Sequence, residues 1–183
     1  MKVALIQLNA GQDKQQNIQR ACALVESAAA KGAVFILLPE VFNYRGHLSG
    51  DDLYNNIAEV IPGESLMPLM ETAKRTSVNI LAGSVYERVQ EKNKVHNTSV
   101  LIDKFGSLVC RYRKINLFHA VIDGKEINEA NIYEAGKKTV LCSIQNKKVG
   151  LSICYDLRFP ELYRNYFNES VDIIVIPSSF TTR

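Results

Sequence analysis

The fold is decided by residues 148–166, which read KVGLSICYDLRFPELYRNY. The apolar run at 148–153 predicts a buried strand, and Pro160 begins a segment typical of a helix. Cys154 lies at the sharp turn between the two. At such a turn a side chain is held rigidly, points out from the edge of the sheet and lies beside free backbone N–H groups. A nucleophilic thiol needs these conditions, so Cys154 is the first candidate functional residue.

Strand-like and helix-like segments alternate through the rest of the chain. Strands are predicted at residues 3–8, 34–38, 79–84, 97–102, 108–111, 139–145 and 173–176. A helix is predicted after Asp13, which with Gln16 resembles a capping box, and it ends at Gly32. A second helix is predicted at about residues 65–77. Helices mixed with parallel and hairpin-type strands predict a layered α/β architecture.

The connections between these segments are of two kinds. Hairpin turns are predicted at residues 103–106 and at Asn146-Lys147. The segment from Asn43 to about Asn56 is rich in Asn, Gly and Asp, which predicts a loop. The segment from Lys114 to Lys138 has little periodicity, so we expect a long, irregular loop there. Loops of the second length are usually functional in compact domains.

The composition is that of one globular domain spanning residues 1–183. Hydrophobic residues make up 46% of the chain and charged residues 22%, which is ordinary for a protein that buries a core. The net charge of +3 is small and there is no basic stripe, so nucleic acid is not an expected partner. The apolar run at residues 1–8 is too short for a signal peptide, and nothing approaches membrane length. We therefore expect a cytoplasmic protein with no membrane partner.

The four cysteines, Cys22, Cys110, Cys142 and Cys154, are scattered along the chain. Without an export signal, we expect all four to be reduced thiols, and all except Cys154 to be core residues. Neither the cysteines nor the three histidines have the spacing of a zinc site. No metal and no cofactor are predicted.

Two further strand ends carry polar residues. Glu40 follows the apolar strand at 34–38 and a proline, and Lys114 follows the strand at 108–111. Active sites of open α/β sheets collect at the carboxyl ends of strands. Lys114 also leads into an apolar stretch, where a lysine often reaches a carboxylate. The plainer interpretation is that Glu40 is a solvated loop residue and Cys154 a core cysteine.

Glu40, Lys114 and Cys154 together are sufficient for amide hydrolysis. The reaction needs a strong nucleophile, a proton carrier, and a cation or N–H groups for the oxyanion. A free thiol is mostly protonated at neutral pH, so it needs a base. With Glu40 as base and acid, Lys114 as fixed cation and Cys154 as nucleophile, neither a metal nor a histidine is required.

Three segments resemble the signature segments of the nitrilase superfamily, the carbon–nitrogen hydrolases. They are LPEVF at 38–42, YRKINLF at 112–118 and VGLSICYDLRFPEL at 149–162. The segments IPGES at 61–65 and HNTSV at 96–100 also resemble family sequence, so the resemblance covers essentially the whole chain. It implies a four-layer α-β-β-α sandwich and a Glu-Lys-Cys triad at Glu40, Lys114 and Cys154.

The resemblance also implies a second glutamate in the loop after the lysine. Glu129 matches that position by its distance to Gly136, and Glu126 and Glu134 are the alternatives. In such enzymes the backbone N–H after the cysteine, here that of Tyr155, joins the lysine in binding the oxyanion.

The resemblance is strongest to the ω-amidase and deaminated-glutathione-amidase branch. It implies that water hydrolyses a small, carboxylate-bearing amide through a cysteine thioester, releasing ammonia. The full-length family is expected to form homodimers. A Cys-His-Glu hydrolase with a nucleophile elbow is disfavoured, because Asp156 stands where the elbow needs a small residue and no histidine has an obvious place beside Cys154.

The chain ends early relative to the family, just after Pro177-Ser178-Ser179. We therefore expect a fold that lacks the family's C-terminal helix and strands. The strand at 173–176 would then lack a neighbour and leave an apolar edge. The alternative function is that of a truncated, catalytically inactive member that binds a partner.

Overall fold

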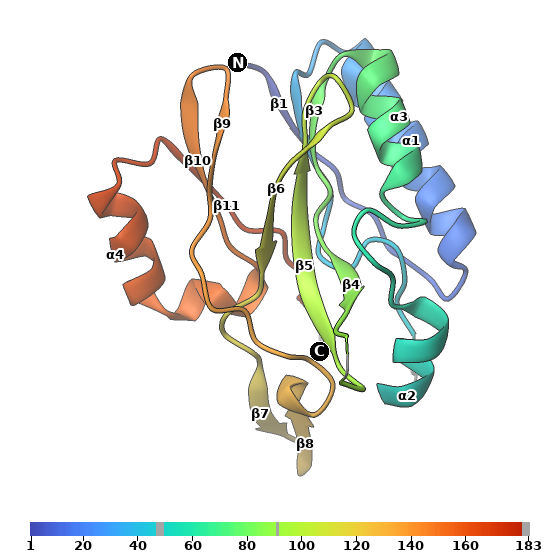
Figure 1. The fold of residues 1–183 in the computed structure, drawn as a ribbon, viewed down its shortest axis with the longest axis vertical. Helices are drawn as coiled ribbons and strands as arrows, with labels where there is room; N and C mark the ends of the chain where they lie inside the picture. The colour runs from blue at the N-terminus through green and yellow to red at the C-terminus, as the bar shows by residue number, and fades with distance from the viewer. Residues whose placement is uncertain (47–49, 91, 181–183) are drawn as a thin grey trace.

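The computed structural model describes residues 1–46, 50–90 and 92–180, and it forms four layers (Figure 1). Helices α1 (Lys14–Ala30) and α3 (Met67–Thr76) cover one face of a larger sheet. Helix α4 (Pro160–Asn168) covers a smaller sheet, and the two sheets pack face to face. The α-β-β-α order of layers expected from the sequence is confirmed.

The larger sheet has six strands. They are β1 (Val3–Leu5), β2 (Phe35–Leu37), β3 (Asn79–Leu81), β4 (Val85–Arg88), β5 (Val95–Ile102) and β6 (Leu108–Arg113). β1, β2 and β3 run parallel, and β5 pairs antiparallel with β3, β4 and β6. Parallel strands covered on both faces are apolar throughout, which explains the uninterrupted apolar sequence around β2.

The smaller sheet consists of β9 (Leu141–Ile144), β10 (Lys147–Leu151) and β11 (Ile173–Val175). β10 pairs antiparallel with β9 and parallel with β11. Within the described residues, no strand pairs with the other edge of β11. A Cβ added at Gly150 would lie only 3.0 Å from ring atoms of Tyr166 on α4. A glycine in β10 therefore lets α4 pack closely on the sheet.

Two apolar cores hold the layers together. One lies between α1, α3 and the larger sheet, and includes Val25, Leu69 and Ile36. The other fills the space between the two sheets, and includes Phe35 and Tyr112 from the larger sheet and Leu151 from the smaller one. Because both sheets are locked face to face, the loops at their strand ends have fixed relative positions.

The predicted start and end of α1 are confirmed. The side chain of Asp13 accepts a hydrogen bond from the backbone N–H of Gln16 at 2.9 Å. The helix ends before Gly32, which has a φ of 84°, in the left-handed region where glycine carries no steric penalty.

Both predicted loops contain regular structure, so those predictions were wrong. Lys114–Lys138 includes a hairpin of β7 (His119–Ile122) and β8 (Lys125–Asn128), followed by a 3₁₀ helix, η2 (Glu129–Asn131). The segment after Asn43 includes α2 (Gly50–Asp52) and a π-helical turn, η1 (Leu53–Ile57); residues 47–49 lie outside the described part. These elements are too short to show a periodic pattern of burial.

The second hairpin turns one residue earlier than predicted. β9 ends at Ile144 and β10 begins at Lys147, so the turn residues are Gln145 and Asn146. Both have positive φ, 48° and 62°, as the two central residues of a type I′ turn do. Asn146 suits such a turn because its side chain tolerates the left-handed conformation.

The expectation that all four cysteines are free thiols was wrong. Cys110 on β6 and Cys142 on β9 form a disulfide, with their Cα atoms 6.6 Å apart, while Cys22 and Cys154 are free. The two bonded residues come from facing sheets and both lie in the core between them. The prediction failed because it considered spacing along the chain, and this proximity is created by the packing of the sheets.

None of the described helices has the length and apolar character needed to cross a membrane.

Candidate active site

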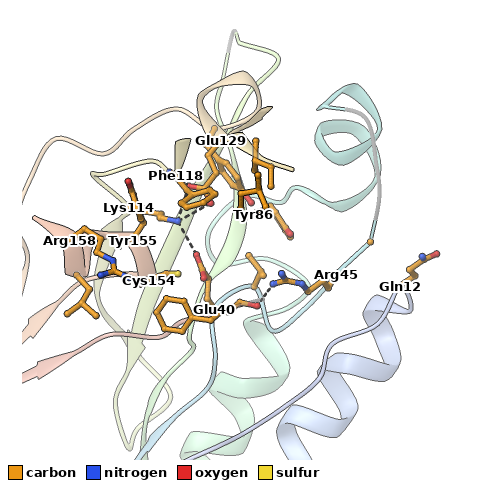
Figure 2. Close-up of a pocket in the computed structure, with 18 residues that line it drawn as sticks. Gln12, Glu40, Arg45, Tyr86, Lys114, Phe118, Glu129, Cys154, Tyr155 and Arg158 are labelled. Atoms are coloured by element: carbon orange, nitrogen blue, oxygen red, sulfur yellow. Dashed lines mark hydrogen bonds and ion pairs between the residues drawn. The ribbon is translucent and has the colours of Figure 1, made fainter. Parts of the chain in front are cut away.

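Four of the predicted residues, Glu40, Lys114, Glu129 and Cys154, line one pocket of about 610 Å³ (Figure 2). Each comes from a different part of the fold. Glu40 lies just past β2, and Lys114 directly follows β6. Glu129 begins η2, and Cys154 begins a 3₁₀ turn, η3 (Cys154–Arg158), just past β10. The carboxyl ends of strands from both sheets therefore meet at this pocket.

Lys114 is the centre of the polar cluster. Its ammonium nitrogen lies 3.2 Å from a carboxylate oxygen of Glu40 and 2.9 Å from one of Glu129, and its side chain is only 1% exposed. Burial alone would lower the pKa of Lys114, but the two carboxylates outweigh it and raise the pKa. The ammonium is therefore charged over the whole physiological pH range.

Cys154 is held in a strained turn. Its φ is 46°, in a region that non-glycine residues rarely adopt and that often marks functional sites. Its backbone N–H donates to the carbonyl of Pro177 at 3.0 Å. Burial and the negative charge of Glu40 raise the pKa of the Cys154 thiol to about 11. At neutral pH the thiol is therefore protonated, beside a carboxylate that can accept its proton.

The carboxylate of Glu40 is fixed by a second neighbour. The side-chain amide of Asn97, on β5, donates to the same oxygen that contacts Lys114, at 2.9 Å. The residue after Glu40, Val41, has a φ of 47° and its N–H donates to the hydroxyl of Ser84 at 2.9 Å. The turn that presents Glu40 is thus tied to the strand region beside it.

Glu129 links Lys114 to the β7–β8 segment. One of its carboxylate oxygens also accepts a hydrogen bond from the backbone N–H of Phe118 at 2.8 Å. The two alternatives for the second glutamate lie elsewhere: Glu126 pairs with His119 and Glu134 with Lys92, both at 2.9 Å. Of the three, Glu129 is the one that contacts Lys114.

From its sequence position, Asp156 only argued against a nucleophile elbow. In the structure, Asp156 joins two parts of the site. It is fully buried and accepts hydrogen bonds from the hydroxyl of Tyr112 at 2.7 Å and from the backbone N–H groups of Asn116 at 2.8 Å and Ile153 at 2.9 Å. Tyr112 and Asn116 flank Lys114, and Ile153 precedes Cys154. The carboxylate of Asp156 therefore fixes the segment around Lys114 relative to the turn at Cys154.

An oxyanion can be bound next to Cys154. Within the described residues, the backbone N–H of Tyr155 has no hydrogen-bond acceptor, as expected for a donor in the first turn of a helix. The Tyr155 ring packs edge-on against Phe118 and Phe159, with centroid distances of 5.0 and 5.5 Å. This packing fixes the backbone of Tyr155 relative to the pocket.

Two arginines, Arg45 and Arg158, line the same pocket. Neither forms an ion pair with any carboxylate in the described part of the chain. Together with Lys114 they place three cations against the carboxylates of Glu40 and Glu129. With a neutral thiol the pocket has one positive charge in excess, which favours an anionic ligand.

The sequence predicted the residues that carry charge or a thiol at strand ends, and the structure brings them together. It did not predict Asn97, Asp156 or Arg45. Every residue of β5 is buried, so its sequence has no alternation that could show which way Asn97 faces, and the contact of Asn97 with Glu40 joins residues 57 positions apart. Arg45 had no local signal, because it lies in a segment without periodicity.

A family model described as carbon-nitrogen hydrolase matches residues 2–183. The chain is 38% identical to the omega-amidase NIT2 of Mus musculus and 36% identical to that of Homo sapiens, in each case over 180 residues that cover 98% of this chain and 63% of the relative. The chain thus spans 63% of the length of these curated relatives.

Two solved structures have a fold similar to that of this chain. A member of branch 10 of the nitrilase superfamily from Saccharomyces cerevisiae superposes with a TM-score of 0.83 at 30% identity, covering 100% of this chain and 65% of that one. The NitFhit protein of C. elegans superposes with a TM-score of 0.87 at 28% identity, covering 98% of this chain and 44% of that one.

Proposed function

This chain belongs to the carbon–nitrogen hydrolase family, and from that premise we propose that it hydrolyses a small amide carrying a carboxylate. The observation that carries the proposal is the position of Lys114 between two carboxylates, in the pocket that also holds the Cys154 thiol. The curated relatives named above are omega-amidases, which supports the choice of an amide over another C–N bond.

In the first half of the proposed reaction, Glu40 takes the proton of Cys154 as the sulfur attacks the amide carbon. The negative charge that develops on the carbonyl oxygen is stabilised by the Lys114 ammonium and the N–H of Tyr155. Glu40 then gives its proton to the leaving nitrogen and the C–N bond breaks. The products are a Cys154 thioester and an amine, which is ammonia for a primary amide.

In the second half, Glu40 acts as a base toward water. The hydroxide equivalent attacks the thioester carbon, the C–S bond breaks, and the proton returns to the sulfur as the carboxylic acid is released. Lys114 remains charged throughout, because its pKa is raised by the two neighbouring carboxylates. Glu129 acts as a positioning residue that fixes Lys114 and the backbone of Phe118.

Arg158 supports a substrate that carries a carboxylate on its acyl part. It belongs to the same 3₁₀ turn as Cys154 and lines the pocket on the thiol side (Figure 2). A guanidinium without a protein carboxylate partner is suited to bind a carboxylate through paired hydrogen bonds.

A screen of small ω-amides, with ammonia release as the signal, tests the proposed function. We expect Cys154→Ala to lose turnover by roughly 10³-fold or more, since covalent catalysis is removed. Cys22→Ala, which changes the other free thiol, is the matched control and should retain turnover. Hydrolysis that survives in Cys154→Ala would show that the cysteine is not the nucleophile, and a folded chain without turnover on any ω-amide would favour a binding subunit instead.

A further inference from the structure

We propose that a second cavity, separate from the catalytic pocket, is a binding site for a phosphate group. The cavity has a volume of about 540 Å³ and shares no lining residue with the pocket that holds Cys154. Its charged and titratable lining residues are His96, Arg111, Arg113, Glu134, Lys137 and Lys138. Binding there is independent of the proposed hydrolysis.

The register of the larger sheet separates this cavity from the catalytic groups. In the pairing of β5 with β6, His96, Arg111 and Arg113 fall on one face of the sheet, because side chains two residues apart share a face and paired residues point the same way. Lys114, the next residue after Arg113, points to the other side, where it contacts Glu40. The strands that present the catalytic lysine on one face therefore present a basic cluster on the other.

The segment that closes the cavity is fixed against the end of β6. The N–H of Gly136 donates to the carbonyl of Lys114 at 2.8 Å. A Cβ at Gly136 would collide with the carbonyl of Arg113, so this close approach requires glycine. Lys137 and Lys138 follow directly and are exposed. A fixed stretch of backbone therefore carries both lysines at the rim of the cavity.

Two arginines at the cavity share one buried carboxylate. Glu87 is 4% exposed and accepts hydrogen bonds from Nε and Nη2 of Arg113 at 2.7 and 2.6 Å. The same carboxylate contacts Nη1 of Arg111 at 3.3 Å. The paired bonds with Arg113 match the geometry of one carboxylate. Most of the donors of Arg111, whose side chain is 50% exposed, therefore remain available to a ligand.

The cavity has more cations than carboxylates among the described residues. Neither Lys137 nor Lys138 forms an ion pair there. The second carboxylate at the cavity, that of Glu134, is paired with Lys92 at 2.9 Å. Lysines on an open surface are commonly solvated, but these two line one concavity together with Arg111. Converging cations of this kind favour an anion with more than one negative charge.

His96 offers a ring nitrogen to a ligand. It is only 7% exposed, and its Nδ1 donates to the carbonyl of Glu134 at 2.6 Å. Nδ1 carries a proton in this contact, since a carbonyl oxygen only accepts. Within the described part of the chain, Nε2 has no hydrogen-bond partner. Buried polar atoms in proteins are almost always hydrogen-bonded, so this nitrogen indicates that a molecule in the cavity completes the contact.

An anion whose oxygens only accept hydrogen bonds should bind together with a proton on His96. Burial and the charge of Arg113 lower the pKa of His96, so without a ligand the ring is neutral at neutral pH and Nε2 is an acceptor. Nε2 must gain a proton before it can donate to such an anion. Binding therefore raises the pKa of His96, and the affinity increases as the pH falls.

The other groups that face His96 keep their charge at mildly acidic pH. Burial raises the pKa of Glu87, but hydrogen bonds led by that of Arg113 outweigh it and lower the pKa. A hydrogen bond from Lys92 lowers the pKa of Glu134. The arginines and lysines at the cavity stay charged. Among the described residues at the cavity, His96 is therefore the group that titrates.

Isothermal titration calorimetry with inorganic phosphate, in chloride buffers of fixed ionic strength, tests the site. Arg111→Gln and Lys138→Gln each remove one charge from the cavity. Arg75→Gln is the matched control, because Arg75 is also exposed and paired with one glutamate, Glu26, but lies on α3 and does not line the cavity. Thermal melts check that each variant is folded.

We expect saturable binding of phosphate to the parent, weakened about tenfold in Arg111→Gln, the usual effect of losing a charge-assisted hydrogen bond. Lys138→Gln should weaken binding less, and Arg75→Gln should match the parent. No saturable binding at millimolar phosphate, or equal weakening by Arg75→Gln and Arg111→Gln, would overturn the assignment. Hydrolysis does not enter the measurement, so a chain without amidase activity would still bind phosphate here.

A parallel titration with phenyl phosphate distinguishes a free phosphate ion from the phosphate group of a larger molecule. Val89 and Val140 also line the cavity, so an attached ring has apolar surface to contact. Tighter binding of phenyl phosphate than of inorganic phosphate would assign the site to a phosphate ester. Equal or weaker binding would assign it to the free ion.

Titration with sulfate tests the role of His96, because sulfate keeps two charges and no proton between about pH 5.5 and 8, the range in which histidine titrates. In the parent, sulfate binding should tighten by up to about tenfold for each pH unit between the pKa values of free and bound His96. His96→Gln retains a donor, so it should still bind sulfate, but without this pH dependence. Sulfate affinity that is independent of pH in the parent would show that His96 does not contact the anion.

Discussion

At the scale of single residues, the Cys154 thiol and the Glu40 carboxylate control each other's protonation. Burial and the charge of Glu40 raise the pKa of the thiol to about 11, while Lys114 partly offsets that rise. A thiol with this pKa is a poor nucleophile at neutral pH until its proton leaves. The carboxylate that keeps the thiol protonated at rest is also the base that removes the proton during attack. The same negative charge therefore suppresses unwanted thiol chemistry and supports the reaction.

Replacing Glu40 by Gln should separate these two effects. Glu40→Gln removes a negative charge that raises the thiol pKa, so the pKa of Cys154 falls and its thiolate fraction at pH 8 increases. Each pKa unit corresponds to about tenfold in thiolate. We expect alkylation of Cys154 by iodoacetamide to become faster, while amide hydrolysis falls by roughly 10²- to 10⁴-fold because the proton carrier is lost.

Peptide mass spectrometry over a range of pH measures the alkylation rate at each cysteine. Cys22 serves as an internal control in the same sample, because no contact joins it to Glu40 among the described residues. Slower alkylation of Cys154 in Glu40→Gln would mean that Glu40 assists even this simple substitution as a base.

At the scale of elements, the site depends on the junction between the end of β6 and the η3 turn. The sequence was sufficient to predict a strand, a turn at Cys154 and a helix from Pro160, because those signals are local. It could not predict that Asp156 binds Tyr112 and Asn116, which lie 44 and 40 positions away. The β7–β8 hairpin escaped prediction for a related reason: much of it is exposed, so burial imposes no pattern on its sequence.

Asp156→Asn should weaken the contact between the end of β6 and the η3 turn, because asparagine has nearly the same size and shape as aspartate but a different hydrogen-bonding pattern. The side chain of Asp156 accepts from Tyr112, Asn116 and Ile153, and an asparagine would direct N–H groups toward some of these donors. Leaving buried donors unpaired costs about 1–3 kcal/mol each, so we expect a loss of roughly 3 kcal/mol in the free energy of unfolding. Urea denaturation measures this loss.

Asp103→Asn is the matched control for the junction. Asp103 also accepts two backbone N–H groups, those of Phe105 and Ser107, but at an exposed hairpin turn, where asparagine serves equally well. We expect a change within about 0.5 kcal/mol there. Equal effects of the two substitutions would show that Asp156 is no more than an ordinary turn residue.

At the scale of the whole molecule, the two sheets act as the frame that brings distant strand ends together. The alternation of strands and helices, with the motif resemblance, was enough to predict the four layers. The pairing of particular side chains across the sheets was not predictable. Cys110 and Cys142 are 32 positions apart and come together in the core between the two sheets, where Tyr112 and Leu151 also pack. Packing of this kind depends on the complete arrangement of both sheets.

The Cys110–Cys142 disulfide should contribute to stability without contributing to chemistry. A cross-link that closes a loop of this length restricts the unfolded chain by roughly 3–4 kcal/mol, so we expect dithiothreitol to lower the urea midpoint substantially. Cys142→Ser should show the same low midpoint with or without dithiothreitol, and Cys22→Ser should respond to the reductant as the parent does. Finding four titratable thiols in the denatured, unreduced protein would show that the bond is absent. Hydrolysis per folded molecule should survive reduction, because Lys114 is held by Glu40 and Glu129, and neither contact passes through the cross-link.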